Sequence, residues 1–233
     1  MTLAVSLCAA EPLASLPQPR EEDWCVAQHE SLNQKALRGD FEVMLIGDSI
    51  TWEWDAEGWE GNRNTGLAVW SQLAKFHPAT FAVSGDRTEH LLWRLQNGNL
   101  ETPVPPRVVV LLIGINNIRQ REDRPEEVAA GIEKIIQTVQ AKFPGVKVLV
   151  YGILPGAKLP EDAPRQAAAA TNELVNKLAD GKTVRFVNIE ADFLDENGLQ
   201  KDEMFRDGLH LSQKGYEAWA KSLLQEIPES PTH

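Results

Sequence analysis

Short apolar runs alternate with amphipathic stretches along most of this chain, and no other feature limits its fold more strongly. Each run is five or six residues long and is bounded by turn-forming residues. Runs of this length are typical of strands that are buried on both faces of a sheet. The sequence predicts five such strands: Glu42–Gly47, Thr80–Ser84, Val108–Ile113, Val146–Tyr151 and Val184–Asn188.

The stretches between these runs have helical periodicity. The clearest one begins at Pro125, which suits a first turn, and continues with Glu126 and Glu127 at the positive end of the helix dipole. The predicted helices are Glu21–Arg38, Pro125–Phe143, about Pro164 to Ala179, and Ser212–Ile227. Strands that alternate with helices of this length predict one α/β domain, over residues 21–228, with a parallel sheet covered on both faces.

The charge balance and the hydropathy pattern exclude several classes of partner. The chain has 23 Lys and Arg against 34 Asp and Glu, a net charge of −11, and its basic residues form no cluster along the sequence. Nucleic acids and anionic membranes both require concentrated basic residues, so neither is expected to bind. No apolar run approaches the roughly 20 residues of a membrane-spanning helix, so we expect no stable membrane insertion. The two cysteines, Cys8 and Cys25, lie in no metal-ligand or disulfide pattern.

The first 20 residues form a segment of different composition. MTLAVSLCAA is apolar and ends in small residues, and the Pro-rich stretch EPLASLPQPR follows it. This arrangement is typical of the second half of a signal peptide, but no Lys or Arg precedes the apolar part. Two interpretations stay open: a partial signal peptide, with a secreted or periplasmic protein, or a loose extension on a cytoplasmic one. Residues 229–233 are expected to form a short tail.

Residues that could take part in chemistry follow three of the predicted strands. They lie in the segments Gly47-Asp48-Ser49-Ile50, Gly85-Asp86 and Gly114-Ile115-Asn116-Asn117. In parallel α/β sheets, ligands bind beyond the carboxyl ends of the strands. We therefore expect Ser49, Gly85 and Asn116 to face the same crevice.

One histidine has an acidic residue at a spacing that suits catalysis. A serine becomes a good nucleophile when a histidine takes its proton, and a carboxylate usually orients that histidine. Asp207 precedes His210 by three residues on a predicted loop before the last helix. The carboxylate can curl back to accept the imidazole Nδ1–H, which leaves the other ring nitrogen free to face Ser49.

A serine mechanism also requires donors for the oxyanion of the tetrahedral intermediate. The strand ends offer three: the backbone N–H groups of Ser49 and Gly85 and the side-chain amide of Asn116. Each of these residues also has an ordinary explanation as a helix cap or a turn residue. Their combination in this order at successive strand ends favours an enzyme.

These blocks resemble the signature blocks of the GDSL, or SGNH, hydrolases, and the resemblance extends from about Phe41 to Leu224. It implies a three-layer flavodoxin-like fold with a five-stranded parallel sheet and neither a metal nor an organic cofactor. It also implies Ser49 as nucleophile and Asp207 with His210 as the acid–base pair. The implied oxyanion donors are Ser49, Gly85 and Asn116.

Within that family, Gly85–Leu100 and the residue Asn117 resemble the catalytic α subunits of intracellular platelet-activating-factor acetylhydrolase. In that group, apolar residues at the positions of Ile50 and Leu209 keep the acyl pocket small. The implied acyl group is short, with acetyl the first choice. Because those subunits pair, a homodimer is also implied.

The sequence therefore predicts a serine esterase for a small-molecule ester, in first place an acetylated carbohydrate or a related small ester. An acetylhydrolase of an ether phospholipid is one alternative. A non-catalytic flavodoxin-like module that binds a small ligand is another. The Trp-rich segment 52–59 could stack on sugar rings or pack in the core, and the usual burial of tryptophan favours the core.

Overall fold

The computed structural model describes residues 10–55 and 65–229, which form a five-stranded parallel sheet with helices on both sides. The strand order is β2-β1-β3-β4-β5. This is the flavodoxin-like order that the family resemblance implied. The strands are β1 (Val43–Gly47), β2 (Pro78–Ala82), β3 (Val108–Leu112), β4 (Lys147–Tyr151) and β5 (Val184–Val187).

The predicted strands are confirmed, with ends that shift by at most two residues. The largest shift is at β2, which begins at Pro78 rather than at Thr80. A proline has no N–H to donate, and it is tolerated here because β2 lies at the edge of the sheet. The earlier end of β2, at Ala82, leaves Ser84 and Gly85 in the loop that follows.

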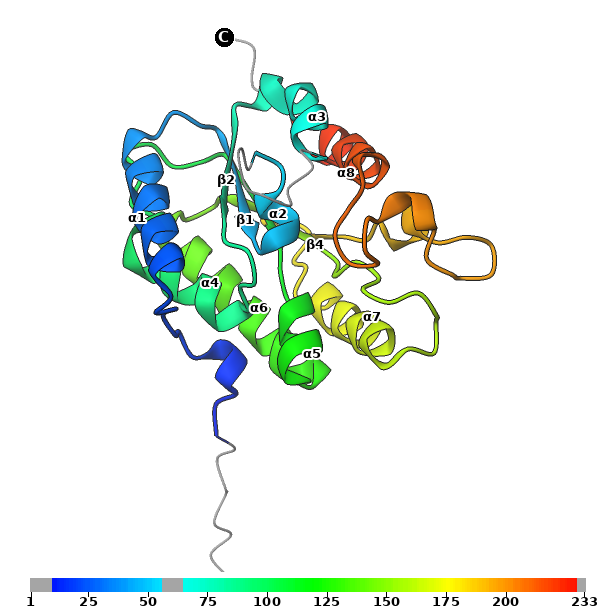
Figure 1. Cartoon of the computed structure of the whole chain (residues 1–233). Coiled ribbons are helices and arrows are strands. Elements are labelled where there is room, and N and C mark those ends of the chain that lie inside the picture. The colour runs from blue at the N-terminus through cyan, green and yellow to red at the C-terminus, as the bar shows by residue number, and fades with distance from the viewer. Residues whose placement is uncertain (1–9, 56–64, 230–233) are drawn as a thin grey trace, which may run out of the picture.

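Two layers of helices cover the sheet. Figure 1 shows α4, α6 and α7 on one side and α3 and α8 on the other. The helix α1 lies next to β2, where Lys35 Nζ donates to the Thr80 carbonyl at 3.1 Å. The helices are α1 (Asp23–Arg38), α2 (Ser49–Trp52), α3 (Leu67–Trp70), α4 (Thr88–Arg94), α5 (Ile115–Arg121), α6 (Pro125–Lys142), α7 (Ala163–Asn176) and α8 (Gln213–Glu226).

The chain direction through the sheet determines where the crevice lies. The chain runs from β1 outward to β2 and then crosses back to β3, on the other side of β1. The loops after β1 and β3 therefore leave in opposite directions, and a crevice opens between them at the carboxyl ends. In the register of these two strands, Gly47 lies opposite Leu112, so both strands end at the same level.

The segment before α1 packs against the domain through Ala14 and Ser15, which are both buried. The one-turn 3-10 helix η1 (Leu13–Ser15) contacts α4 and α6, and its Ala14 is buried. The Thr88 hydroxyl donates to the Ala14 carbonyl at 2.8 Å, and the Gln18 N–H donates to the Glu89 carbonyl at 3.1 Å. The packed chain thus begins before residue 21, where the sequence placed the domain boundary. The apolar residues 1–9 lie outside the described residues.

The Trp-rich segment contributes to the core. Trp54 is completely buried and contacts the rings of Trp70, Tyr216 and Trp219. Core packing is therefore confirmed for Trp54, whereas Trp59 lies outside the described residues. The cluster attaches the residues after α2 to α8.

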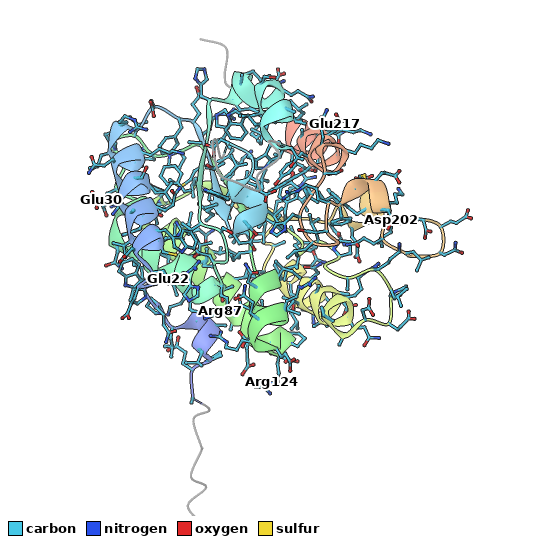
Figure 2. All side chains as sticks on the ribbon, viewed as in Figure 1. Glu22, Glu30, Arg87, Arg124, Asp202 and Glu217 are labelled. Atoms are coloured by element: carbon cyan, nitrogen blue, oxygen red, sulfur yellow. The ribbon has the colours of Figure 1, made fainter. Side chains whose placement is uncertain are left out.

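Exposed acidic side chains are found on several elements. Glu30 on α1, Asp202 in the 3-10 helix η5 (Asp202–Met204) and Glu217 on α8 lie at the periphery in Figure 2. Within residues 10–55 and 65–229, no helix combines the length and the apolar character that crossing a membrane requires.

Candidate active site

Ser49 lies at the start of a helix directly after the central strand. β1 ends at Gly47, where a Cβ would lie 2.3 Å from the Leu112 carbonyl oxygen, so only glycine permits this close strand pairing. Asp48 then caps α2 by accepting the Ile50 N–H at 3.0 Å. Ser49 follows as the first residue of α2 and is 5% exposed.

The loop before α8 orients His210 through its own aspartate. One carboxylate oxygen of Asp207 accepts the backbone N–H groups of Leu209 at 3.0 Å and His210 at 2.7 Å. The other oxygen lies 2.7 Å from His210 Nδ1. The curl that the Asp207–His210 spacing predicts is therefore present.

The imidazole of His210 joins this loop to Ser49. Its Nε2 lies 3.0 Å from Ser49 Oγ, although the two residues are 161 positions apart in the chain. Burial alone would raise the pKa of Asp207, but the hydrogen bonds from the His210 side chain and from backbone N–H groups lower it to about 2. An ionised carboxylate has no proton to donate, so Nδ1 carries the proton and Nε2 is left to accept the Ser49 hydroxyl proton.

The other two predicted oxyanion donors lie at the ends of the neighbouring strands. Asn116 is buried in the first turn of α5, and its amide nitrogen donates to the Asp86 carbonyl at 2.9 Å. That nitrogen carries two protons, so a second one remains for a ligand. Gly85 has a φ of +80°, in the region that favours glycine.

Arg20 orients the Gly85 peptide, and sequence reasoning missed this residue. Its guanidinium donates to the Ser84 carbonyl at 2.6 Å and lies 3.4 Å from Asp86 Oδ1. In a planar trans peptide the carbonyl and the N–H point in opposite directions. Arg20 therefore directs the Gly85 N–H away from itself. No local pattern marks Arg20, because it belongs to the segment that precedes the predicted domain.

Buried polar contacts hold the loop after β2 in place. Arg94 on α4 forms an ion pair with Asp86 at 2.8 Å, and both side chains are buried. Asn117 on α5 accepts the Thr88 N–H at 2.9 Å and donates to Glu89 at 3.1 Å. Asn117 thus connects α5 to α4 through both its carbonyl oxygen and its amide nitrogen. An asparagine suits this position because its side chain both accepts and donates.

The two residues predicted to line the acyl pocket differ in burial. Ile50 is 2% exposed and belongs to the hydrophobic core, where its carbonyl accepts the Tyr216 hydroxyl proton at 2.7 Å. Leu209 is half-buried and directly precedes His210. Leu209 therefore has side-chain surface near the imidazole, whereas Ile50 has almost none.

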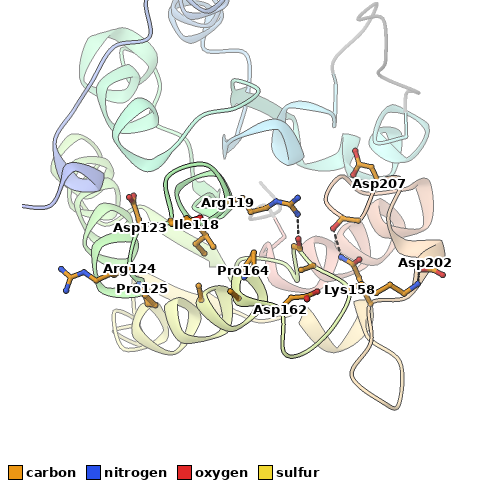
Figure 3. A pocket seen from close by; sticks show the side chains of 17 residues that line it. Ile118, Arg119, Asp123, Arg124, Pro125, Lys158, Asp162, Pro164, Asp202 and Asp207 are labelled. Carbon is orange, nitrogen blue, oxygen red and sulfur yellow. Dashed lines mark hydrogen bonds and ion pairs between the residues drawn. The ribbon is translucent and has the colours of Figure 1, made fainter.

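A groove of about 980 Å³ extends from the loop that carries Asp207 (Figure 3). Asp207 and Gly208 of that loop line it, whereas Ser49 and His210 do not. Its walls come from α5, from α7 and from the segment between β4 and α7. The charged residues that line it are Arg119, Arg124, Lys158, Glu122, Asp123, Asp162, Asp202 and Asp207. Within the described residues, no group of three His, Cys, Asp or Glu side chains could hold a metal ion.

Comparison with known proteins identifies the family. The model of the GDSL-like lipase/acylhydrolase family matches residues 45–218. The chain belongs to this family. It is 32% identical to the platelet-activating factor acetylhydrolase IB subunit alpha2 of Homo sapiens, over 95% of this chain and 93% of that protein. The predicted enzyme class, a GDSL-type ester hydrolase, is therefore confirmed.

Solved structures of this family share the fold of the acylhydrolase. A GDSL-like lipase from Bacteroides thetaiotaomicron superposes with a TM-score of 0.66 at 19% identity, over 85% of this chain and 95% of that chain. An acetylxylan esterase from Geobacillus stearothermophilus gives a TM-score of 0.62 at 18% identity, over 83% and 97% of the two chains. The predicted three-layer α/β fold is confirmed.

Asp48 should make the stability of the acylhydrolase depend on pH. Burial is the main cause that raises its pKa to about 7, and its Oδ2 has no hydrogen-bond partner among the described residues. Between about pH 4 and 7, the unfolded carboxyl is ionised while the folded one keeps its proton, so stability falls as pH rises. Asp48→Asn removes this loss. The difference in free energy of unfolding between this variant and the wild type should therefore shift in favour of the variant by on the order of 4 kcal/mol between pH 4 and pH 8.

Denaturant unfolding at both pH values measures this difference. Asp40→Asn is the matched control, because the Asp40 side chain is 70% exposed and its ion pair with Arg38, at 3.9 Å, lies on the surface. A difference between Asp48→Asn and wild type that does not change with pH would contradict the buried, protonated carboxyl.

Ester hydrolysis should decline at acid pH through protonation of a single group. Asp207, with a pKa of about 2, stays ionised over the working range, whereas a proton on His210 Nε2 removes the acceptor for the Ser49 hydroxyl. We expect log kcat/KM for p-nitrophenyl acetate to fall with a slope of about one on the acid side. An activity that does not fall at acid pH argues against a base that must be unprotonated.

Proposed function

We propose that this acylhydrolase removes short acyl groups, acetyl first, from a hydroxylated small molecule of the carbohydrate type. The observation that carries the proposal is the chain of hydrogen bonds from Ser49 to His210 to Asp207 beside a polar groove. Serine is the nucleophile, histidine the base and aspartate the group that orients it.

The reaction follows from the positions of these groups. His210 Nε2 takes the proton as Ser49 Oγ attacks the ester carbonyl, and the negative charge collects on the carbonyl oxygen. The backbone N–H groups of Ser49 and Gly85 and the second amide proton of Asn116 stabilise that oxygen. The imidazolium then gives its proton to the departing alcohol. Water, activated by the same histidine, releases the acyl group from Ser49.

The lining of the groove favours a polar alcohol. Three basic and five acidic side chains line it, and Ile118 is the largest apolar residue among its described lining. Hydroxyl groups can hydrogen-bond to such a lining, whereas a long alkyl chain would leave the charged groups without water or partners. The acetylxylan esterase from Geobacillus stearothermophilus, a structural neighbour, acts on an acetylated polysaccharide by its name.

The second candidate is an acetylhydrolase of an ether phospholipid. The 32% identity to the platelet-activating factor acetylhydrolase subunit over nearly the whole chain favours it. A small acyl pocket suits both candidates, so the alcohol moiety distinguishes them. A homodimer, which the same relationship suggests, stays a prediction.

Replacement of the proposed nucleophile tests the mechanism. Ser49→Ala should lower kcat on p-nitrophenyl acetate by at least about 10³-fold, because it removes the attacking oxygen and leaves only the oxyanion donors. A fluorophosphonate probe should label the wild type at Ser49 and leave the variant unlabelled.

Ser71→Ala, at an exposed serine on the surface, is the matched control and should behave as wild type. Full turnover by Ser49→Ala would falsify the assignment. A wild-type enzyme that resists the probe would instead favour the non-catalytic binding module.

The alcohol moiety can be tested by direct competition between substrates. Acetate release should be at least about tenfold more efficient, as kcat/KM, from acetylated xylo-oligosaccharides than from an acetylated ether phospholipid, because the groove is polar. The phospholipid should be presented both as monomer and as micelles, since its aggregation changes its free concentration. The reverse ranking in both forms would favour the phospholipid candidate.

A further inference from the structure

A buried ion pair lies directly behind the Ser49–His210 contact. Both carboxylate oxygens of Glu53 lie 2.6 Å from Arg206 Nη2. The Glu53 side chain is 2% exposed and that of Arg206 is 16% exposed. Glu53 is the middle residue of Trp52-Glu53-Trp54. Core packing explains Trp54 in this segment but does not explain Glu53.

Each partner is bonded to the backbone of one reacting residue. The Glu53 N–H donates to the Ser49 carbonyl at 3.0 Å, at the end of the single turn of α2. The Arg206 N–H donates to the His210 carbonyl at 2.8 Å, and Arg206 Nε donates to the Leu211 carbonyl at 3.3 Å. The ion pair therefore connects the turn that carries the nucleophile with the loop that carries the base.

This connection spans two segments that the sheet does not hold together. α2 follows the central strand β1, whereas the loop with Asp207 and His210 comes after the last strand and belongs to no strand of the sheet. The Tyr216 hydroxyl bond to the Ile50 carbonyl attaches α2 to α8, which begins after the loop. Besides the Ser49–His210 contact itself, the Glu53–Arg206 pair connects the end of α2 directly with the start of the loop.

The energetics of a buried ion pair suggest a geometric role. Removing two charges from water costs about as much as their mutual attraction returns, so such a pair adds little net stability. It does, however, allow only one arrangement, because each charge must meet its partner. Reactions between positioned groups are sensitive to errors of an ångström.

We propose that Glu53 and Arg206 are positioning residues that hold Ser49 and His210 at hydrogen-bonding distance. The inference rests on the proposed serine mechanism and extends it to two residues that touch neither the substrate nor the reacting atoms. The ion pair sets the distance between nucleophile and base, and the substrate-binding surfaces are formed independently of it.

The test removes both charges together, so that no unpaired charge stays buried. Glu53→Gln/Arg206→Gln keeps side chains that can hydrogen-bond to each other. We expect kcat on p-nitrophenyl acetate and the rate of fluorophosphonate labelling at Ser49 to fall by on the order of 10²-fold. KM should change less than about twofold, because the groove and the oxyanion donors are unaltered.

Two further variants separate positioning from folding. Glu101→Gln/Lys142→Gln removes an exposed ion pair of 2.6 Å at the far end of α6, and it should react as wild type. Arg206→Lys keeps the positive charge but lacks the guanidinium fork, so it should fold and show an intermediate kcat with unchanged KM. Thermal unfolding and circular dichroism establish the folded fraction of each variant.

The outcomes are distinct. The inference is overturned if the folded double variant reacts with the fluorophosphonate probe at the wild-type rate. It is also overturned if the double variant has a lower Tm but a wild-type kcat per folded molecule. If the double variant does not fold, Arg206→Lys decides: wild-type kcat overturns the inference, and a lower kcat at constant KM supports it. A wild-type enzyme that does not react with the probe overturns the proposed function, and this inference with it.

Discussion

The parallel arrangement of five buried strands is the constraint on which the rest of the structure depends. All five strands point the same way, so the loops after β1, β2 and β3 leave at one edge of the sheet. This arrangement brings Ser49, Gly85 and Asn116 to the same edge. The order β2-β1-β3 also places β1 in the middle of the three. Ser49, the proposed nucleophile, therefore lies between the two loops that carry Gly85 and Asn116, the other proposed oxyanion donors.

The loops at this edge depend on buried charges. Asp86 with Arg94, and Glu53 with Arg206, are ion pairs whose carboxylates are fully or almost fully buried. Such pairs contribute little net stability, but they leave the backbone few alternatives. A site that stabilises developing charge benefits from this rigidity, because its donors need not reorganise during the reaction. The same edge also contains Asp48, whose carboxyl is buried with a hydrogen-bond partner for only one of its two oxygens and so favours its neutral form.

Family membership and the local chemistry answer different questions about this enzyme. The match over residues 45–218 establishes an acylhydrolase, whereas the proposal of a polar alcohol rests on the acidic and basic side chains of the groove. The name of one relative refers to platelet-activating factor, and that of one structural neighbour refers to acetylxylan. Family membership and a shared fold therefore do not determine the alcohol.

The sequence by itself determined the strands, the four long helices and the spacing of Asp207 and His210, because these depend on periodicity and on contacts between close neighbours in the chain. It also placed Ser49, Gly85 and Asn116 at strand ends. Only the tertiary structure showed that Arg20 bonds to the loop after β2 and that Glu53 pairs with Arg206, 153 positions away. Contacts between such distant residues leave no local pattern, since they form only when the whole sheet has brought the segments together.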